Sequence, residues 1–324
     1  MSSNIRADSA SLADAAADWK SAYVHIPFCR RRCPYCDFAI VDESTGVTPG
    51  HDVYVKAVIA EIAMEEPFDS LDAINFGGGT PSLLDPLQIG SIIEALDRHS
   101  GISRDAEISI EVNPEDWTDR YADGLASVGV NRVSFGAQSV DGELLGVLGR
   151  MHTHEQTVAA VAGARSVGMR SVSVDMIFGH PAESDASWDT TVASVVELPI
   201  DHISSYALTV EPGTDLAREV SSGAVGPDDD IQADRYLAFS TAAASAGFDR
   251  YEVSNHARQG HACRYNLATW ANAEYLGFGL AAHDHRVGIR SRNHRRIDRY
   301  MEAVHEGVRP RLGSEHLDAK AEER

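Results

Sequence analysis

Short apolar runs alternate with amphipathic stretches along most of this chain. The runs are rich in β-branched residues and cover positions 22–28, 73–76, 108–112, 132–135, 171–178 and 203–210. In the stretches between them, apolar residues recur three to four positions apart, and several stretches end at a Gly that suits a helix C-terminus. Because strand–helix alternation gives parallel sheets with crossover helices, the pattern predicts an α/β fold with six strands in a barrel-like sheet.

Polar and Gly-rich segments follow the predicted strands. In chain order they read "CRRRCPYC", "GGGTPS", "EVNPE", "GAQS", "DMIFGHP" and "YALTVEPG". Each alone is consistent with an ordinary turn, since Gly-Gly and Asn-Pro pairs are common in turns. In a parallel barrel, however, the C-terminal ends of the strands form the functional face. Six such segments therefore predict a binding or catalytic site at that face.

Three of the four cysteines lie within eight residues. Cys29, Cys33 and Cys36 share one loop, whereas Cys263 is far downstream. Disulfides within that loop would be cramped, so a reduced compartment and a metal centre are favoured. A [4Fe-4S] cluster held by three thiolates leaves one iron open for another ligand, which suits this spacing. Structural zinc is the alternative, and it needs a fourth ligand such as His25 or Cys263.

Composition excludes several classes of partner. The 324 residues are 43% hydrophobic, which is enough for a substantial core. A formal charge of -21, from 28 basic and 49 acidic residues, argues against nucleic acid as a partner. The sequence lacks an apolar run of about 18 residues, and its acidic, Ser/Ala-rich start differs from a secretory signal. We therefore expect a cytoplasmic protein without stable membrane insertion.

The ordered motifs resemble those of the HemN/HemW family of radical S-adenosylmethionine (SAM) proteins. The resemblance spans residues from about 23 to about 285 and rests on "YVHIPFCRRRCPYCDF", "FGGGTPSLL", "SIEVNPE", "RVSFGAQS", "GRMHT", "VSVDMIFGHP" and "SSYALTVEPGT". It implies an incomplete (β/α)6 barrel with a C-terminal extension. We expect a disordered segment at 1–20, the barrel core at 21–250 and a family-specific C-terminal region at 251–324. Family members usually continue into a further helical domain, so the C-terminal region is expected to be either truncated or naturally short.

The resemblance also implies roles for individual residues. Cys29, Cys33 and Cys36 would ligate three irons of a [4Fe-4S] cluster, and the fourth iron would bind SAM. The positions that match SAM contacts are Tyr23, Tyr35, Gly78, Gly79, Thr80, Glu111, Gln138, Arg150, Asp175 and Ala207. Structural alternatives exist for several of these: Arg150 and Asp175 could form an ion pair, and Tyr23 could belong to the core.

One departure from the family pattern favours its HemW branch, and a second departs from the signature of that branch. The coproporphyrinogen-oxidising branch usually has a further Cys where this chain has Phe38. Members of the HemW branch resemble haem chaperones, which bind haem and pass it to an acceptor protein, here unspecified. Their signature Cys-x-His-Asn-x-x-Tyr-Trp is present as "CRYNLATW", with Tyr265 in place of the histidine. The alternative function is a radical SAM oxidoreductase that acts on a porphyrinogen or on an unassigned substrate.

Haem would need an axial ligand and partners for its propionates. A tyrosinate at Tyr265 is one candidate ligand. Histidines crowd the same part of the sequence and are further candidates, namely His256, His261, His283 and His285. The basic segment "RSRNHRRIDRY" could meet a propionate. The last segment, "SEHLDAKAEER", is charged and has a helix-like composition.

Overall fold

Six parallel strands form the centre of the fold. The computed structural model describes residues 16–317, so most of the N-terminal segment expected to be disordered lies outside the described residues. In the order in which they pair, the central strands are β1 (Ser21–Ile26), β4 (Leu71–Gly78), β5 (Ile102–Val112), β6 (Arg132–Gln138), β7 (Ser171–Phe178) and β8 (His202–Ala207). Each overlaps one apolar run of the sequence, so the predicted strand set is confirmed.

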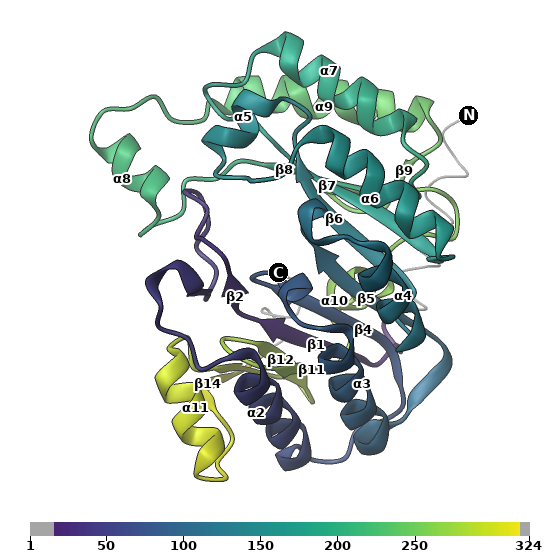
Figure 1. Ribbon diagram of the computed structural model, residues 1–324, viewed down its shortest axis with the longest axis vertical. Coiled ribbons are helices and arrows are strands. Elements are labelled where there is room, and N and C mark those ends of the chain that lie inside the picture. Colours follow the sequence, from purple (N-terminus) through teal and green to yellow (C-terminus); the bar gives the residue numbers. More distant parts are fainter. Residues whose placement is uncertain (1–15, 318–324) are drawn as a thin grey trace.

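Helices cover the outer face of these strands (Figure 1). They are α2 (His51–Met64), α3 (Pro86–Ser100), α4 (Asp119–Ser127), α5 (Gly142–Val147), α6 (His154–Ser166), α7 (Asp185–Glu197) and α9 (Asp229–Ser245). The short helix α8 (Asp215–Ser221) lies apart from this layer, and the Leu216 N–H donates to the Pro34 carbonyl of the cysteine loop (2.9 Å). Local sequence sets their ends: Asp85 begins α3 with a capping box to Gln88, and Gly101 ends it with φ of 77°. None of the helices in residues 16–317 is long and apolar enough to cross a bilayer.

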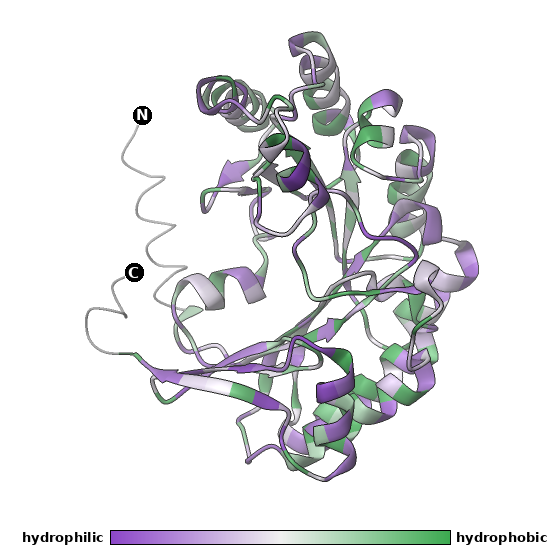
Figure 2. Cartoon of the chain, turned by 90° about the vertical axis from the view of Figure 1, so that its left-hand side faces the viewer, coloured by the Kyte–Doolittle hydropathy of each residue, from purple (hydrophilic) through white to green (hydrophobic). Residues whose placement is uncertain are grey.

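The core lies between the strands and this helical layer. Alternate residues of β1, such as Ala22, Val24 and Ile26, are fully buried against it. Figure 2 shows apolar residues gathered where helices face the sheet and hydrophilic residues on the outer surface. Because the side chains of a strand alternate between faces, Tyr23 and His25 point to the other side, into the barrel.

Both edges of the central sheet are extended, so the barrel stays open. β11 (Tyr275–Phe278) pairs parallel to β1, and β12 (His283–Arg286), β13 (Ile289–Asn293) and β14 (Arg311–His316) follow antiparallel. On the other edge β10 (Asn255–Ala257) pairs with β8, and β9 (Asp249–Arg250) pairs with β10. The expectation of a helix-like last segment is wrong for 314–316. These residues belong to β14 because pairing with β13 outweighs their weak local preference.

A buried carboxylate joins the extension to the barrel. Glu61 of α2 accepts hydrogen bonds from the backbone N–H of Gly279 (2.8 Å), the amide of Asn293 (2.6 Å) and the hydroxyl of Tyr300 (2.6 Å). Tyr300 lies on α11 (Ile297–His305). Burial raises the pKa of Glu61 to about 7. One turn later, Glu65 forms ion pairs with Arg286 and Arg311, which also connect α2 to the extension.

Replacing Glu61 by Ala is expected to lower the free energy of unfolding by about 3 kcal/mol or more. Three buried donors would lose their acceptor, and each unsatisfied donor costs about 1–3 kcal/mol. Urea unfolding followed by circular dichroism measures the change. Glu94→Ala is the control, because Glu94 is exposed on α3 and forms only a surface pair with Arg98. Equal losses in the two variants would contradict the assigned role of Glu61.

Candidate functional site

The C-terminal ends of the six parallel strands surround a cavity of about 450 Å³. Its wall includes the cysteine loop and residues from the end of every strand from β4 to β8. Figure 1 shows the loop after β1 on the open side of the curved sheet, away from the outer helices. Parallel pairing brings these strand ends together, which is why segments spread over the sequence meet at one site. The volume is in the range of small-molecule and cofactor sites.

The three cysteines line this cavity and are half-buried. Cys29 lies in the short strand β2 (Phe28–Cys29), which pairs with β3 (Val41–Asp42) at the end of the loop. The Cys36 N–H donates to the Cys33 carbonyl (3.1 Å), and the Arg32 guanidinium donates to the Cys36 carbonyl (2.9 Å). Side chains within 16–317 form no group of three His, Cys, Asp or Glu that could hold one metal ion. A [4Fe-4S] cluster has no such need, since each thiolate binds a different iron.

Burial and hydrogen bonding set the state of the first thiol. The Thr80 hydroxyl lies 3.5 Å from Cys29 Sγ, and burial raises the pKa of Cys29 to about 11. The free thiol therefore keeps its proton at neutral pH. Metal binding to such a thiol releases the proton, because the thiolate is the ligand.

The Gly-rich segment is required by the chain's own packing. A Cβ atom on Gly79 would lie 2.7 Å from the Pro27 carbonyl group, and one on Gly78 would lie 2.4 Å from the His25 ring. Gly78 also has a φ of 111°, which side chains rarely adopt. The turn after β4 therefore packs so closely on β1 and on the start of the cysteine loop that only glycine fits at these two positions. The expected approach of the segment to SAM remains a prediction.

Two carboxylates face the cavity from neighbouring parts of the barrel. Glu111, at the end of β5, accepts from the Gly78 N–H (3.3 Å), and burial together with the charge of Asp175 raises its pKa to about 7. Asp175 on β7 accepts from the Ser134 hydroxyl (2.8 Å), and burial raises its pKa. Both carboxylates are therefore poised to gain a cationic or hydroxyl-bearing partner.

Arg150 supplies a positive charge in the same cavity. Its guanidinium donates to Asn113 Oδ1 (2.5 Å) and to the Gly136 carbonyl (3.0 Å). Arg150 Nε is buried and has no hydrogen-bond partner among the described residues, which fits a polar ligand in the cavity. The alternative ion pair between Arg150 and Asp175 is not formed, since the described partners of Arg150 are Asn113 and Gly136 and that of Asp175 is Ser134. Tyr35, Gln138 and Ala207 line the same cavity, as do Thr80 and the two glycines.

Tyr23 lies in a second, adjoining cavity of about 370 Å³. Its hydroxyl is 3.1 Å from His25 Nδ1, and its ring stacks on Tyr265 at a centroid distance of 5.9 Å. Tyr23 thus faces a cavity and not the helix-covered core. Asp37, Phe38 and Gly78 line both cavities, so the cysteine loop forms the partition between them.

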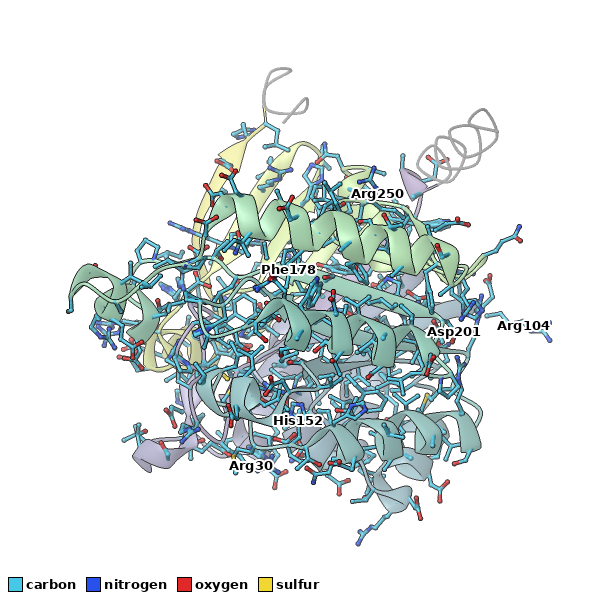
Figure 3. The ribbon with its side chains drawn as sticks, turned by 90° about the horizontal axis from the view of Figure 1, so that it is seen from above. Arg30, Arg104, His152, Phe178, Asp201 and Arg250 are labelled. Atoms are coloured by element: carbon cyan, nitrogen blue, oxygen red, sulfur yellow. The ribbon has the colours of Figure 1, made fainter. Side chains whose placement is uncertain are left out.

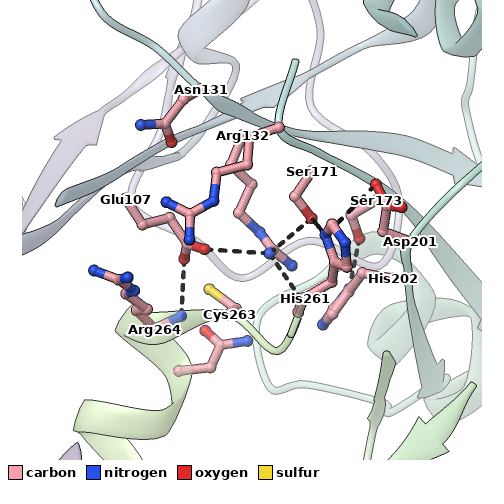
Figure 4. Close-up of polar contacts among 12 residues, drawn as sticks. Glu107, Asn131, Arg132, Ser171, Ser173, Asp201, His202, His261, Cys263 and Arg264 are labelled. Carbon is pink, nitrogen blue, oxygen red and sulfur yellow. Dashed lines mark hydrogen bonds and ion pairs between the residues drawn. The ribbon is translucent and has the colours of Figure 1, made fainter. Parts of the chain in front are cut away.

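Cys263 lies at the opposite ends of the strands. It precedes α10 (Arg264–Trp270), whose first backbone N–H donates to Glu107 (2.8 Å) near the middle of β5, beside Arg132 at the start of β6. Figure 4 shows Cys263 beside this pair, and Figure 3 shows Arg30 of the cysteine loop far from Asp201, which precedes β8. Cys263 is therefore remote from the three-cysteine loop. Neither candidate for a fourth zinc ligand meets the three cysteines. Cys263 is remote, and both ring nitrogens of His25 are engaged, one by the Tyr23 hydroxyl and the other by the Ala39 carbonyl.

The four histidines that cluster in the sequence are dispersed in the fold. His256 is buried on β10 with its ring edge-on to Phe239, and His261 lies 3.4 Å from Ser171 Oγ at the start of β7. His283 and His285 are on β12, at the other edge of the sheet. Although they are close in the sequence, the four histidines do not form one group in the fold, because the central strands lie between β10 and β12 in the sheet.

Some residues of the two cavities were missed as individual candidates. Asn113 and Tyr206 line the first cavity, and Arg292 and Arg295 line the second. The first two lie in segments that the sequence already marked as following strands. The two arginines belong to the basic segment, but their meeting with the cysteine loop depends on the pairing of β11 with β1.

An incomplete six-stranded parallel barrel with three cysteines at its C-terminal face defines the radical SAM class. The model of the Radical SAM superfamily matches residues 23–195. The protein named heme chaperone HemW of Mycobacterium tuberculosis is 37% identical over 305 residues, which are 92% of this chain and 78% of that protein. Its namesake of Synechocystis sp. is 37% identical over 267 residues, 81% of this chain and 65% of that protein. The chain therefore belongs to the HemW family of the radical SAM superfamily.

A solved structure agrees with this assignment. Coproporphyrinogen III oxidase (HemN) from Escherichia coli superposes with a TM-score of 0.81 at 25% sequence identity, over 97% of this chain and 75% of that one. Membership of the radical SAM superfamily implies SAM and a [4Fe-4S] cluster as cofactors. The half-buried thiols, the two carboxylates and the unpartnered Arg150 Nε fit these groups.

Proposed function

We propose that this protein binds haem and transfers it to an acceptor protein, and that it carries a SAM-coordinated [4Fe-4S] cluster. The observation that carries the haem part is the 37% identity, over 92% of the chain, to a protein named heme chaperone HemW. The cavity that adjoins the cluster loop supports this proposal, because it offers separate space for a second ligand.

The cluster would be held by Cys29, Cys33 and Cys36, and its open iron would supply a binding point for the amino and carboxylate groups of SAM. The chain's own residues would orient the rest of the molecule. Arg150 would neutralise a carboxylate, and Glu111 and Asp175 would accept from the amino group or the ribose hydroxyls. The other proposed contacts come from the strand ends, namely Tyr35, Gly78, Gly79, Thr80, Gln138 and Ala207, with Tyr23 reaching the site only from the adjoining cavity.

The direct test of haem binding is a titration of the anaerobically reconstituted protein with hemin, with and without SAM. We expect a saturable change in the Soret band at one hemin per chain. Binding that does not saturate, measured on cluster-loaded protein, would overturn the chaperone proposal. Transfer is then tested by adding an apo-haem protein as acceptor and following its spectrum.

The resemblance to HemN favours one other candidate, oxidation of a porphyrinogen. We expect this protein not to convert coproporphyrinogen III, because Phe38, which is 57% exposed between the two cavities, occupies the position of that branch's additional Cys. A phenyl ring cannot reproduce the proton transfer or ligation of a thiol. Anaerobic incubation with SAM and a reductant, followed by chromatography of the porphyrins, measures the activity. Protoporphyrinogen formation above the background of Cys29→Ala would favour the oxidase.

A further inference from the structure

The second cavity is built from two segments far apart in the sequence. One wall is the cysteine loop with β1, and the other comes from α10 and strands β11 to β13. The Arg295 guanidinium donates to the Asp37 carbonyl (2.8 Å) and so ties the extension to the residue that follows Cys36. The cavity of about 370 Å³ is smaller than a complete porphyrin with its substituents. A bound porphyrin would therefore be partly enclosed and partly exposed.

One side of the cavity is an aromatic surface. The Tyr23 and Tyr265 rings are nearly parallel, with an interplanar angle of 23°, and Tyr275 meets Tyr265 edge-on at 6.2 Å. Phe38 adds an exposed ring from the cysteine loop. Such a surface suits the face of a planar macrocycle. Burial raises the pKa of Tyr265, so its hydroxyl stays protonated in the haem-free protein.

The same cavity is also lined by a histidine and two arginines. His283 on β12 is directly opposite Arg292 on β13, so their side chains leave the same face of the sheet. Burial and the charge of Arg292 lower the pKa of His283, which keeps its imidazole neutral and able to bind a metal. Within residues 16–317, the Arg292 guanidinium has no hydrogen bond or ion pair, and Arg295 contacts only a neutral carbonyl. The cavity thus holds two arginines without an ion pair among the described residues, in a chain of charge -21.

We propose that His283 is the axial ligand of haem in this cavity and that Arg292 and Arg295 bind its two propionates, while the macrocycle lies against the Tyr23–Tyr265 pair. This assignment rests on the proposed haem function and specifies its site. It gives Tyr265, which replaces the family histidine, a packing role. Partial enclosure leaves part of the haem open to an acceptor.

The first experiment separates His283 from Tyr265 as the ligand. Reconstituted parent, His283→Ala and Tyr265→Phe are titrated with hemin, and His261→Ala is the control because His261 lies at the opposite ends of the strands. We expect hemin bound to His283→Ala to lack the parent's Soret band. Added free imidazole should replace the missing ligand and shift the Soret band back toward that of the parent. Tyr265→Phe and His261→Ala should keep the parent's spectrum. Unchanged SAM affinity in all variants shows that they are folded.

The second experiment separates carboxylate recognition from iron ligation. Metal-free protoporphyrin IX has the same propionates but no iron, so His283→Ala should bind it as the parent does. The double variant Arg292→Gln/Arg295→Gln should bind both protoporphyrin and hemin roughly ten- to hundredfold more weakly, as expected for lost charge-assisted hydrogen bonds. Arg296→Gln/Arg299→Gln is the matched control, because these arginines are exposed at the start of α11 and pair with Asp298 and Glu302.

The outcomes distinguish the site from the function. A parent that binds hemin, together with His283→Ala and Arg292→Gln/Arg295→Gln variants that bind it equally well, would overturn the assigned site and leave the chaperone function standing. Loss of the parent spectrum in Tyr265→Phe but not in His283→Ala would also overturn it and would make Tyr265 the ligand. A parent without saturable hemin binding would overturn the proposed function and the site together.

Discussion

Replacing Cys29, Cys33 or Cys36 by Ala is expected to abolish the oxygen-sensitive [4Fe-4S] cluster of the anaerobically reconstituted protein. The three thiols share the wall of one cavity, and the described residues nearby offer no further cysteine to replace a lost ligand. Iron and acid-labile sulfide analysis, with the absorption spectrum near the cluster band, measures the loss. In the parent we expect about four irons and four sulfides per chain.

Cys263→Ala is the matched control for this prediction. Cys263 is buried beside Glu107 and Arg132 at the other ends of the strands, and burial raises its pKa to about 12. We expect this variant to bind the same amount of iron and sulfide as the parent. Stoichiometric zinc without labile sulfide in the parent, or loss of the cluster in Cys263→Ala, would refute the assignment of the ligands.

Glu111→Gln is expected to weaken SAM binding by roughly tenfold or more at pH 8, since a charge-assisted hydrogen bond contributes about 1.5–3 kcal/mol. The pKa of the Glu111 carboxyl group, about 7 in the free protein, predicts that SAM binding also depends on pH. Below that pH the carboxyl group is protonated, so the parent's affinity should rise as pH increases through 7 and Glu111 becomes ionised. The Gln variant should lack this increase. Isothermal titration of cluster-loaded protein at pH 6 and pH 8 measures both effects.

Glu61→Gln is the control for Glu111→Gln. Glu61 is also buried and also has a pKa raised to about 7, but its partners are Gly279, Asn293 and Tyr300, outside the SAM cavity. This variant should retain both the affinity for SAM and its increase with pH. If Glu61→Gln weakens SAM binding as much as Glu111→Gln does, general destabilisation and not a direct contact would explain both. Unchanged affinity in a double Arg150→Ala/Asp175→Ala variant would likewise refute the proposed contacts.

The central strands were predictable because each contains a short run rich in apolar and β-branched residues, most of which are buried. The positions of Glu111 and Asp175 followed from the same pattern, since parallel strands place their C-terminal ends together. Local sequence was sufficient here because every strand pairs with the next one along the chain. The spacing of the cysteines likewise identified their loop before any tertiary contact was known.

The extension beside β1, which consists of strands β11 to β14, was not predictable from local sequence pattern. β13 reads "IRSRN", in which charged side chains obscure the alternation of a strand, and its place depends on the distant pairing of β11 with β1. The second cavity depends on the same long-range contact, so the sequence could group Tyr23 only with the SAM contacts. It also grouped His256 with His283, although the two lie at opposite edges of the sheet. Closeness in the sequence does not predict closeness in space here, because β11 follows β10 along the chain but pairs with β1 on the opposite side of the sheet.

The pairing of β11 with β1 also has a consequence for synthesis. The first cavity is lined by residues up to Glu211, so its wall has been translated long before the wall of the second cavity, which needs Arg295. Until residues 275–278 leave the ribosome, one edge of β1 lacks its neighbour and presents unpaired backbone groups next to the cysteine loop. All residues that line the first cavity are therefore present in the nascent chain before the second cavity can form, and the last strands to be made close both the exposed edge and the second cavity.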